Sequence, residues 1–276
     1  LVRHHPGQHR TGGPVAAVAL ARDIAVNVAP HPLFKPEGAE KSEKQDDAHG
    51  EGEDRSRWAY EIEVKPEKDG QVAWDAPGYG ASDAFSLDNP SPEDYARALS
   101  VLLGALQVQS FVLVAQSLGC LIAASYARSF PLEKMLLISP AGGYAGDLSR
   151  IRARLEQLDT LGPEGLAVQR AAGMLSPAAP PEALELVRWN YRRIRRDGYR
   201  QAAHCLASGN LRADAPSFGG RVLVARGSAD TITPEAGCRE IAAAFPHAAD
   251  RTLPGLGHAA QAEDPRAVNA MIRGFA

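Results

Sequence analysis

Short, almost wholly apolar runs alternate with amphipathic segments along most of the chain. A continuous apolar run bounded by turn residues is typical of a strand that is covered on both faces, as strands of parallel sheets are. The pattern predicts strands over 71–74 (QVAW), 111–115 (FVLVA), 134–139 (KMLLIS) and 221–226 (RVLVAR).

Helical patterns stand between these predicted strands. Residues 91–106 begin with Ser91 and Pro92, a typical N-cap followed by proline in the first turn. Residues 118–130 and 264–276 are also expected to be helical. Strands that alternate with helices predict an α/β fold with a doubly wound, mostly parallel sheet.

Residues 140–218 interrupt that alternation, because they show helical patterns separated by Pro and Gly and no predicted strand. We therefore expect a helical lid inserted between two strands of one core domain. The core would comprise residues 1–139 and 219–276, and 140–218 would form the lid. Its arginines could meet an anionic substrate, although such a run usually forms a solvated helix face: Arg152, Arg154, Arg192, Arg193, Arg195 and Arg196. Its large apolar residues are expected to pack on the core or to line an acyl pocket: Met174, Trp189, Tyr191, Tyr199 and Phe218.

A second interruption, residues 35–69, is dominated by Asp, Glu, Lys and Arg. So few apolar residues cannot offset the entropy lost on ordering the segment, so we predict a charged, flexible insertion. A short strand is expected within it, at WAYEIEV (58–64).

The composition restricts the class of partner. The chain has 276 residues, of which 45% are hydrophobic, with a formal net charge of −3. This charge gives no reason to expect nucleic acid or an anionic membrane as a partner. No apolar run is long enough for a transmembrane helix, so we expect no membrane association of that kind.

Cysteine and histidine usage suggests neither disulfides nor a metal. Cys120, Cys205 and Cys238 are widely spaced, which favours a reducing compartment and predicts a cytoplasmic protein. His4, His5 and His9 have no carboxylate or thiol nearby, so we predict no metal site and no cofactor.

The stretch AQSLG, residues 115–119, joins a predicted strand directly to a predicted helix. A turn this sharp needs small residues two positions either side of Ser117, and Ala115 and Gly119 satisfy that need. The unpaired N–H groups of the helix start, that of Leu118 first, would face a developing oxyanion. Ser117 is thus either a nucleophile or an ordinary turn serine.

AQSLG resembles the nucleophile elbow G-x-S-x-G of the α/β-hydrolase superfamily, with Ala in place of the first Gly. Further motifs follow in the family's order: Asp230 after the strand RVLVAR, then His258 in a Gly-His-x-x-x-x-Glu setting. WDAPGYGASD (74–83) resembles the family's Asp-x-x-Gly-x-Gly-x-Ser loop. The resemblance covers residues 71–276 and is to lid-bearing esterases, enol-lactonases and meta-cleavage-product hydrolases.

The resemblance implies a catalytic triad of Ser117 as nucleophile, His258 as base and Asp230 as the group that orients the base. An alternative acid is Asp147, and Asp230 could instead cap the helix that begins near Pro234. Gln116 is expected at the exposed rim of the substrate pocket.

The resemblance also implies a second oxyanion donor, in a loop after the family's third strand. LVRHHPGQ (1–8) resembles the start of that strand, and the family's first two strands are expected to be missing. Pro6 stands at the position of the family's Gly and has no N–H to donate, so Gly7 is the nearest substitute.

Together these features predict a serine hydrolase that cleaves a small ester, enol-lactone or related carbonyl compound through an acyl-enzyme. Its partner would be the small acyl or lactone substrate, and nothing in the sequence indicates an oligomeric state. The alternative is a non-catalytic binding protein of the same fold with an altered oxyanion loop.

Overall fold

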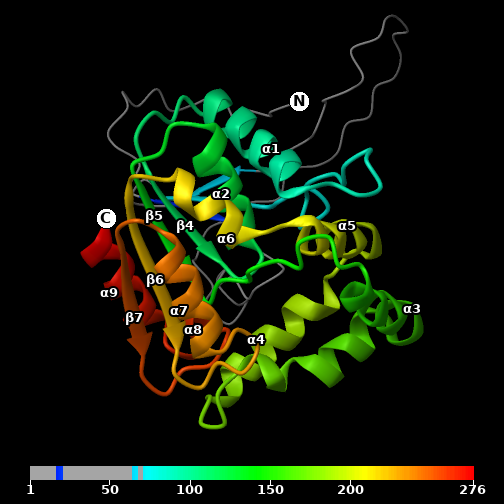
Figure 1. Ribbon diagram of the computed structural model, residues 1–276. Helices are drawn as coiled ribbons and strands as arrows, with labels where there is room; N and C mark the ends of the chain where they lie inside the picture. The colour runs from blue at the N-terminus through cyan, green and yellow to red at the C-terminus, as the bar shows by residue number, and fades with distance from the viewer. Residues whose placement is uncertain (1–16, 21–63, 68–70) are drawn as a thin grey trace, which may run out of the picture.

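The computed structural model describes residues 17–20, 64–67 and 71–276 (Figure 1). Its strands form one sheet in the order β2-β3-β1-β4-β5-β6-β7, parallel throughout except for the antiparallel pair of β2 and β3. The strands are β1 (Ala17–Leu20), β2 (Val64–Glu67), β3 (Gln71–Trp74), β4 (Val112–Gln116), β5 (Lys134–Ile138), β6 (Arg221–Gly227) and β7 (Ala248–Leu253).

The helices cover both faces of this sheet, which confirms the predicted doubly wound α/β fold. They are α1 (Pro92–Ala105), α2 (Gly119–Ser129), α3 (Ser149–Arg170), α4 (Pro181–Arg192), α5 (Arg196–Ser208), α6 (Leu211–Asp214), α7 (Glu235–Ala244), α8 (Ala260–Glu263) and α9 (Pro265–Phe275), with 3-10 turns η1 (Ala172–Met174) and η2 (Ala215–Ser217). The predicted start of α1 is confirmed: the Ser91 side chain accepts from Asp94 N–H, and Asp94 accepts from Ser91 N–H at 2.8 Å.

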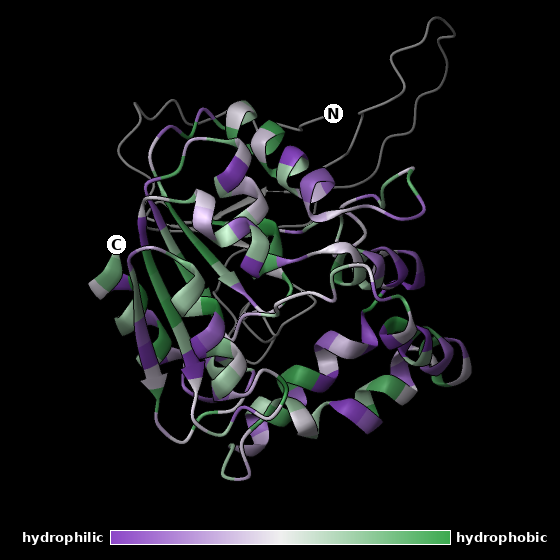
Figure 2. Ribbon diagram, viewed as in Figure 1, coloured by the Kyte–Doolittle hydropathy of each residue, from purple (hydrophilic) through white to green (hydrophobic). Residues whose placement is uncertain are grey.

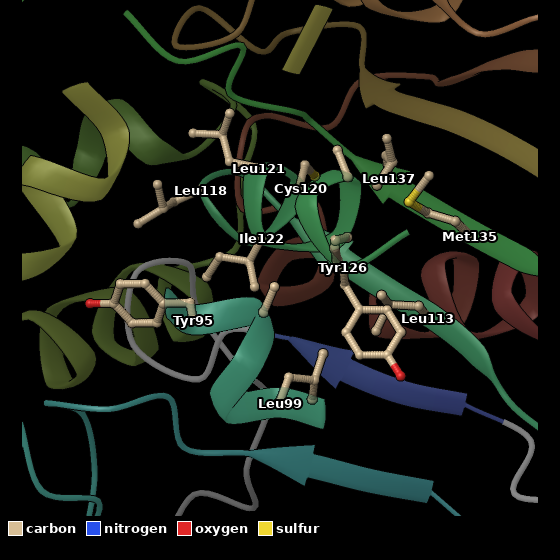
Figure 3. Close-up of a cluster of buried hydrophobic side chains, with 14 of the residues drawn as sticks. Tyr95, Leu99, Leu113, Leu118, Cys120, Leu121, Ile122, Tyr126, Met135 and Leu137 are labelled. Carbon is tan, nitrogen blue, oxygen red and sulfur yellow. The ribbon is translucent and has the colours of Figure 1, made fainter. Parts of the chain in front are cut away.

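The central strands are buried on both sides because their alternate residues enter two different clusters. Leu113 and Ala115 of β4 pack with α1, α2 and α7, whereas Val112 and Val114 pack with α9. Figure 3 shows side chains of α2 lying over Leu113, Met135 and Leu137 of the sheet. In Figure 2 these central strands are mostly hydrophobic, whereas the edge strand β7 is largely hydrophilic.

Residues 140–218 contain helices and, as expected, no strand. Helices α3, α4 and α5 group together beyond the carboxyl ends of the central strands (Figure 1). The end of the segment packs on the core, because Leu211, Ala215 and Phe218, like residues of α5, belong to the cluster that contains α2. Helix α3 is kinked at Gly162, whose φ of 64° and ψ of −178° are not helical.

Three features of the sheet differ from the expectations. The strand between β3 and β4 is β1 at Ala17–Leu20, which was not predicted; the expected strand at 1–8 lies outside the described residues. Residues 64–67, expected as part of a charged insertion, form strand β2 at Val64–Glu67, and residues 58–63 of the strand expected at 58–64 lie outside the described residues. Strand β7 was also missed, because four of its six residues are exposed and it lacks an apolar run.

Candidate active site

The turn between β4 and α2 holds Ser117 in an uncommon conformation. Its φ is 52°, in the left-handed region that residues other than glycine seldom adopt. Two backbone hydrogen bonds support it: Ser117 N–H donates to Ile138 O at 3.0 Å, and Ser117 O accepts from Ala141 N–H at 3.1 Å. Strained residues of this kind concentrate at functional sites.

His258 and Asp230 reach Ser117 from the carboxyl ends of neighbouring strands. Asp230 follows β6, and His258 follows β7 and is 1% exposed. His258 Nε2 lies 3.0 Å from Ser117 Oγ, and its Nδ1 lies 2.9 Å from Asp230 Oδ2. The three side chains therefore form a hydrogen-bonded chain from carboxylate to imidazole to hydroxyl.

Asp230 is buried, and its neighbours favour the ionised form. Burial alone would raise its pKa, but hydrogen bonds from His258 and Thr233 and attraction to His258 outweigh that effect and lower the pKa to about 2. Its Oδ1 accepts from the N–H groups of Ile232 and Thr233 at 2.8 and 2.9 Å. The alternative acid, Asp147, is exposed and accepts hydrogen bonds from Ser149 instead.

Thr233 is a part of this site that the sequence did not suggest. Its Oγ1 donates to Asp230 Oδ2 at 2.7 Å and lies 3.2 Å from His258 Nδ1. The signal was present in the spacing, because a threonine three residues after an aspartate can hydrogen-bond back to it.

The loop that carries His258 is held by Glu263. Glu263 Oε1 accepts from Gly257 N–H at 2.8 Å and from Ser176 N–H at 3.0 Å, and Oε2 accepts from Ser176 Oγ. One carboxylate thus joins the residue before His258 to the helical segment 140–218.

Gln116 does not lie where it was expected. It is 7% exposed, so the prediction of an exposed position at the pocket rim is wrong. Its Nε2 donates to His258 O at 2.9 Å, which ties the elbow to the histidine loop. Gln116 is still part of β4, a central strand that is covered on both faces, and this explains its burial.

Of the two expected oxyanion donors, only Leu118 lies in the described part of the chain. Leu118 precedes the first residue of α2, and within that part no acceptor is assigned to its N–H. Gly7 lies outside the described residues. Leu20, the last residue of β1, pairs with Ala115, so the carboxyl end of β1 lies beside the elbow.

A cavity of about 550 Å³ opens onto Ser117 and His258. This volume is typical of a site for a small molecule. Leu118 also lines it, together with many residues of the segment 140–218. Of the five large apolar side chains singled out there, Met174, Tyr191 and Tyr199 line the cavity, and Trp189 and Phe218 do not.

A model of the family described as "Alpha/beta hydrolase family" matches residues 48–271. The chain belongs to the alpha/beta hydrolase family. The comparison with curated proteins found no match for this hydrolase-family chain.

Solved structures of similar fold include several hydrolases. A thermophilic esterase from Thermogutta terrifontis has a TM-score of 0.68 and 22% identity, over 74% of this chain and 78% of that chain. The enol-lactonase from Burkholderia xenovorans has a TM-score of 0.68 and 22% identity, over 74% of this chain and 80% of that chain. An esterase from Exiguobacterium antarcticum has a TM-score of 0.67 and 16% identity, over 75% of this chain and 81% of that chain. At these identities the likeness shows the fold alone.

The described part of the chain contains no group of three or more His, Cys, Asp or Glu side chains arranged to hold a metal ion. His4, His5 and His9 lie outside it. Cys120, Cys205 and Cys238 are free and buried. None of the described helices is both long and apolar enough to cross a membrane.

Proposed function

We propose that this member of the α/β-hydrolase family cleaves a small carboxylic ester or lactone through an acyl-enzyme at Ser117. The observation that carries the proposal is the 3.0 Å separation of Ser117 Oγ and His258 Nε2, on a turn that holds Ser117 at a φ of 52°. A serine hydroxyl needs a neighbouring base to become a useful nucleophile, and a strained elbow presents it to the cavity.

In the proposed reaction His258 Nε2 takes the Ser117 proton while Oγ attacks the carbonyl carbon. The tetrahedral oxyanion accepts a hydrogen bond from Leu118 N–H, and its collapse breaks the acyl–oxygen bond as His258 protonates the departing alkoxide. A water molecule, deprotonated by His258, then attacks the acyl-enzyme and releases the carboxylic acid and free Ser117. In a lactone the two products remain one hydroxy acid.

Asp230 is proposed to keep Nδ1 of His258 protonated, so that Nε2 is free to act as base, and to stabilise the imidazolium. A carboxylate whose pKa is lowered to about 2 remains ionised at neutral pH, as this role requires. Helices α3, α4 and α5 are proposed to act as a lid, since their side chains line much of the cavity.

The class of substrate draws support from the esterase and enol-lactonase of similar fold. A non-catalytic binding protein is the competing function, and the two differ in whether Ser117 reacts. A binding protein needs the cavity but not an activated hydroxyl.

Labelling with a fluorophosphonate, followed by peptide mass spectrometry, tests the proposal. We expect an adduct on Ser117 in the wild type, none in Ser117→Ala, and a loss of labelling of at least about 10³-fold in His258→Ala. A folded wild-type protein that gives no adduct would rule out the hydrolase and favour the binding protein.

A further inference from the structure

The charged side chains that line the cavity are almost all of one sign. They are Arg150, Arg154, Arg170, Arg212 and Glu240. Glu240 Oε2 pairs with Arg212 Nη1 at 2.5 Å, so these two charges offset one another. Among the described residues, no carboxylate on the cavity wall balances the other three arginines.

Arg154 and Arg170 lie on the two halves of α3, on either side of the kink at Gly162. Arg170 Nε donates to Gln157 Oε1 at 3.1 Å, and Nη2 donates to the same oxygen. These bonds show that the second half of α3 folds back beside the first half. Gln157 is neutral, so this bond orients the guanidinium without cancelling its charge. It uses two of the five N–H donors of Arg170.

Arg154 is half-buried, and no carboxylate in the described part of the chain pairs with either Arg154 or Arg170. By contrast, neighbouring arginines of the same helical segment are paired at the surface: Arg188 with Glu185, Arg192 with Glu164, and Arg200 with Asp159. Arg154 and Arg170 thus face the cavity without such a partner.

Both guanidinium groups act on the same half-buried phenol. Burial raises the pKa of Tyr191, whereas the charges of Arg154 and Arg170 work in the opposite direction. Tyr191 also lines the cavity, so the two arginines and this hydroxyl approach one region of its wall. Tyr191 stays protonated at neutral pH and can donate a hydrogen bond there.

We propose that the substrate carries a carboxylate in addition to its ester or lactone carbonyl, and that Arg154 and Arg170 bind this carboxylate. The planar guanidinium matches a carboxylate in two parallel hydrogen bonds, and an enclosed cavity screens the attraction less than open solvent does. Arg150, which is exposed and stacks at 4.7 Å over the Tyr144 ring, adds positive charge at the entrance. The inference rests on the proposed function, since the bound group would be part of its substrate.

A matched pair of esters tests whether the enzyme prefers a substrate that carries a carboxylate. The two are the mono-4-nitrophenyl ester of adipic acid and the corresponding ester of its monoamide. The two differ only in a carboxylate and a neutral carboxamide of nearly equal size. We expect the wild type to favour the acid in kcat/KM by at least about tenfold, mainly through KM. Added salt should reduce the preference.

Arg154→Gln and Arg170→Gln should each lower kcat/KM for the acid ester more than for the amide ester, so that the preference falls about tenfold. Arg152→Gln is the matched control, because Arg152 is exposed on the same helix and does not line the cavity. The inference is overturned if the wild type treats the two esters alike, or if the preference survives both cavity variants.

Calorimetry with adipate separates this inference from the proposed function, because it needs no turnover. If no ester is cleaved and Ser117 forms no adduct, the hydrolase proposal fails, and adipate binding then decides the inference. Binding that Arg154→Gln and Arg170→Gln weaken about tenfold and Arg152→Gln does not would sustain it. Absent binding, or binding indifferent to these substitutions, would overturn it.

Discussion

The carboxylate of Asp230 is a buried negative charge that several neighbouring groups stabilise. It accepts hydrogen bonds from two backbone N–H groups, the Thr233 hydroxyl and His258. A buried charge is tolerated only when it is paired and hydrogen-bonded, and Asp230 meets both conditions. The same contacts that keep it ionised also fix the ring orientation of His258.

Asp230→Asn is therefore expected to impair catalysis more than folding. The amide can donate to Nδ1 and so favours the tautomer in which Nε2 carries the proton, which removes the base from Ser117. We expect kcat for ester hydrolysis to fall on the order of 10³–10⁴-fold. Steady-state kinetics measure this, and a loss below about tenfold would remove Asp230 from the proposed triad.

The same variant should show a pH-dependent difference in stability. The folded pKa of about 2 lies below the ordinary value of 3.8, so ionised Asp230 stabilises the fold above pH ~4, and that contribution disappears as pH falls towards 2. At pH 7 the variant should be less stable by about 2 kcal/mol. Denaturant titrations should show the gap closing between pH ~4 and ~2, and a constant gap would contradict this sign.

At the residue scale, the sequence placed the three principal residues but not their supports. Motif order indicates Ser117, Asp230 and His258, because the first two follow strands with visible apolar runs and His258 follows a glycine-rich turn. The sequence places Gln116 in an exposed turn after a strand that ends at residue 115, whereas β4 extends through Gln116 and buries it. The hydrogen bond from Thr233 to Asp230 follows a three-residue spacing that the sequence shows, whereas the approach of Thr233 to His258 depends on the fold.

At the scale of elements, the loop 254–259 between β7 and α8 carries His258 and relies on Glu263 at the end of α8. Gly257 is confined as well: a Cβ there would lie 2.5 Å from Ser176 N. The histidine loop is thus packed directly against the segment that follows η1.

Glu263→Gln tests whether this carboxylate positions the loop. A glutamine presents one acceptor oxygen where the glutamate presents two, so contacts to Gly257 and Ser176 weaken. We expect a loss of about 1–3 kcal/mol in the free energy of unfolding and fluorophosphonate labelling of Ser117 slowed about tenfold. Glu185→Gln, exposed on α4, is the control. Equal labelling rates in both variants would leave Glu263 with a structural role only.

The sequence predicts those elements whose own residues indicate, by apolar runs or caps, that the element packs on the sheet. Strands β3 to β6 and helices α1, α2 and α9 show apolar runs or caps that reflect burial on the sheet. Strand β7 lies at the edge with exposed residues, and β1 is only AVAL within a region of weak pattern. Their positions depend on pairing with distant strands, which a local pattern does not contain.

At the scale of the whole molecule, the segment 140–218 is joined to the core by polar contacts and close backbone approaches. Gln201 of α5 is buried; its Nε2 donates to Phe85 O and Leu87 O, both at 2.8 Å, and its Oε1 accepts from Phe85 N–H at 3.1 Å. A Cβ at Gly198 would lie 2.0 Å from Gly78 O, so α5 meets the loop after β3 at backbone distance. These contacts determine how firmly one wall of the cavity is held.

Gln201→Ala should therefore loosen α5 while leaving the sheet intact. The backbone of Phe85 and Leu87 loses the Gln201 side chain, and we expect a loss of about 1–3 kcal/mol that is confined to this junction. Hydrogen exchange should quicken in α5 and residues 85–87 but not in β4, β5 or β6. Arg200→Ala is the control, since Arg200 is the preceding residue of α5 and pairs with Asp159 at the surface. Exchange that rises equally in the sheet would mean that α5 and the core unfold together, and that the proposed lid does not move independently of the site beneath it.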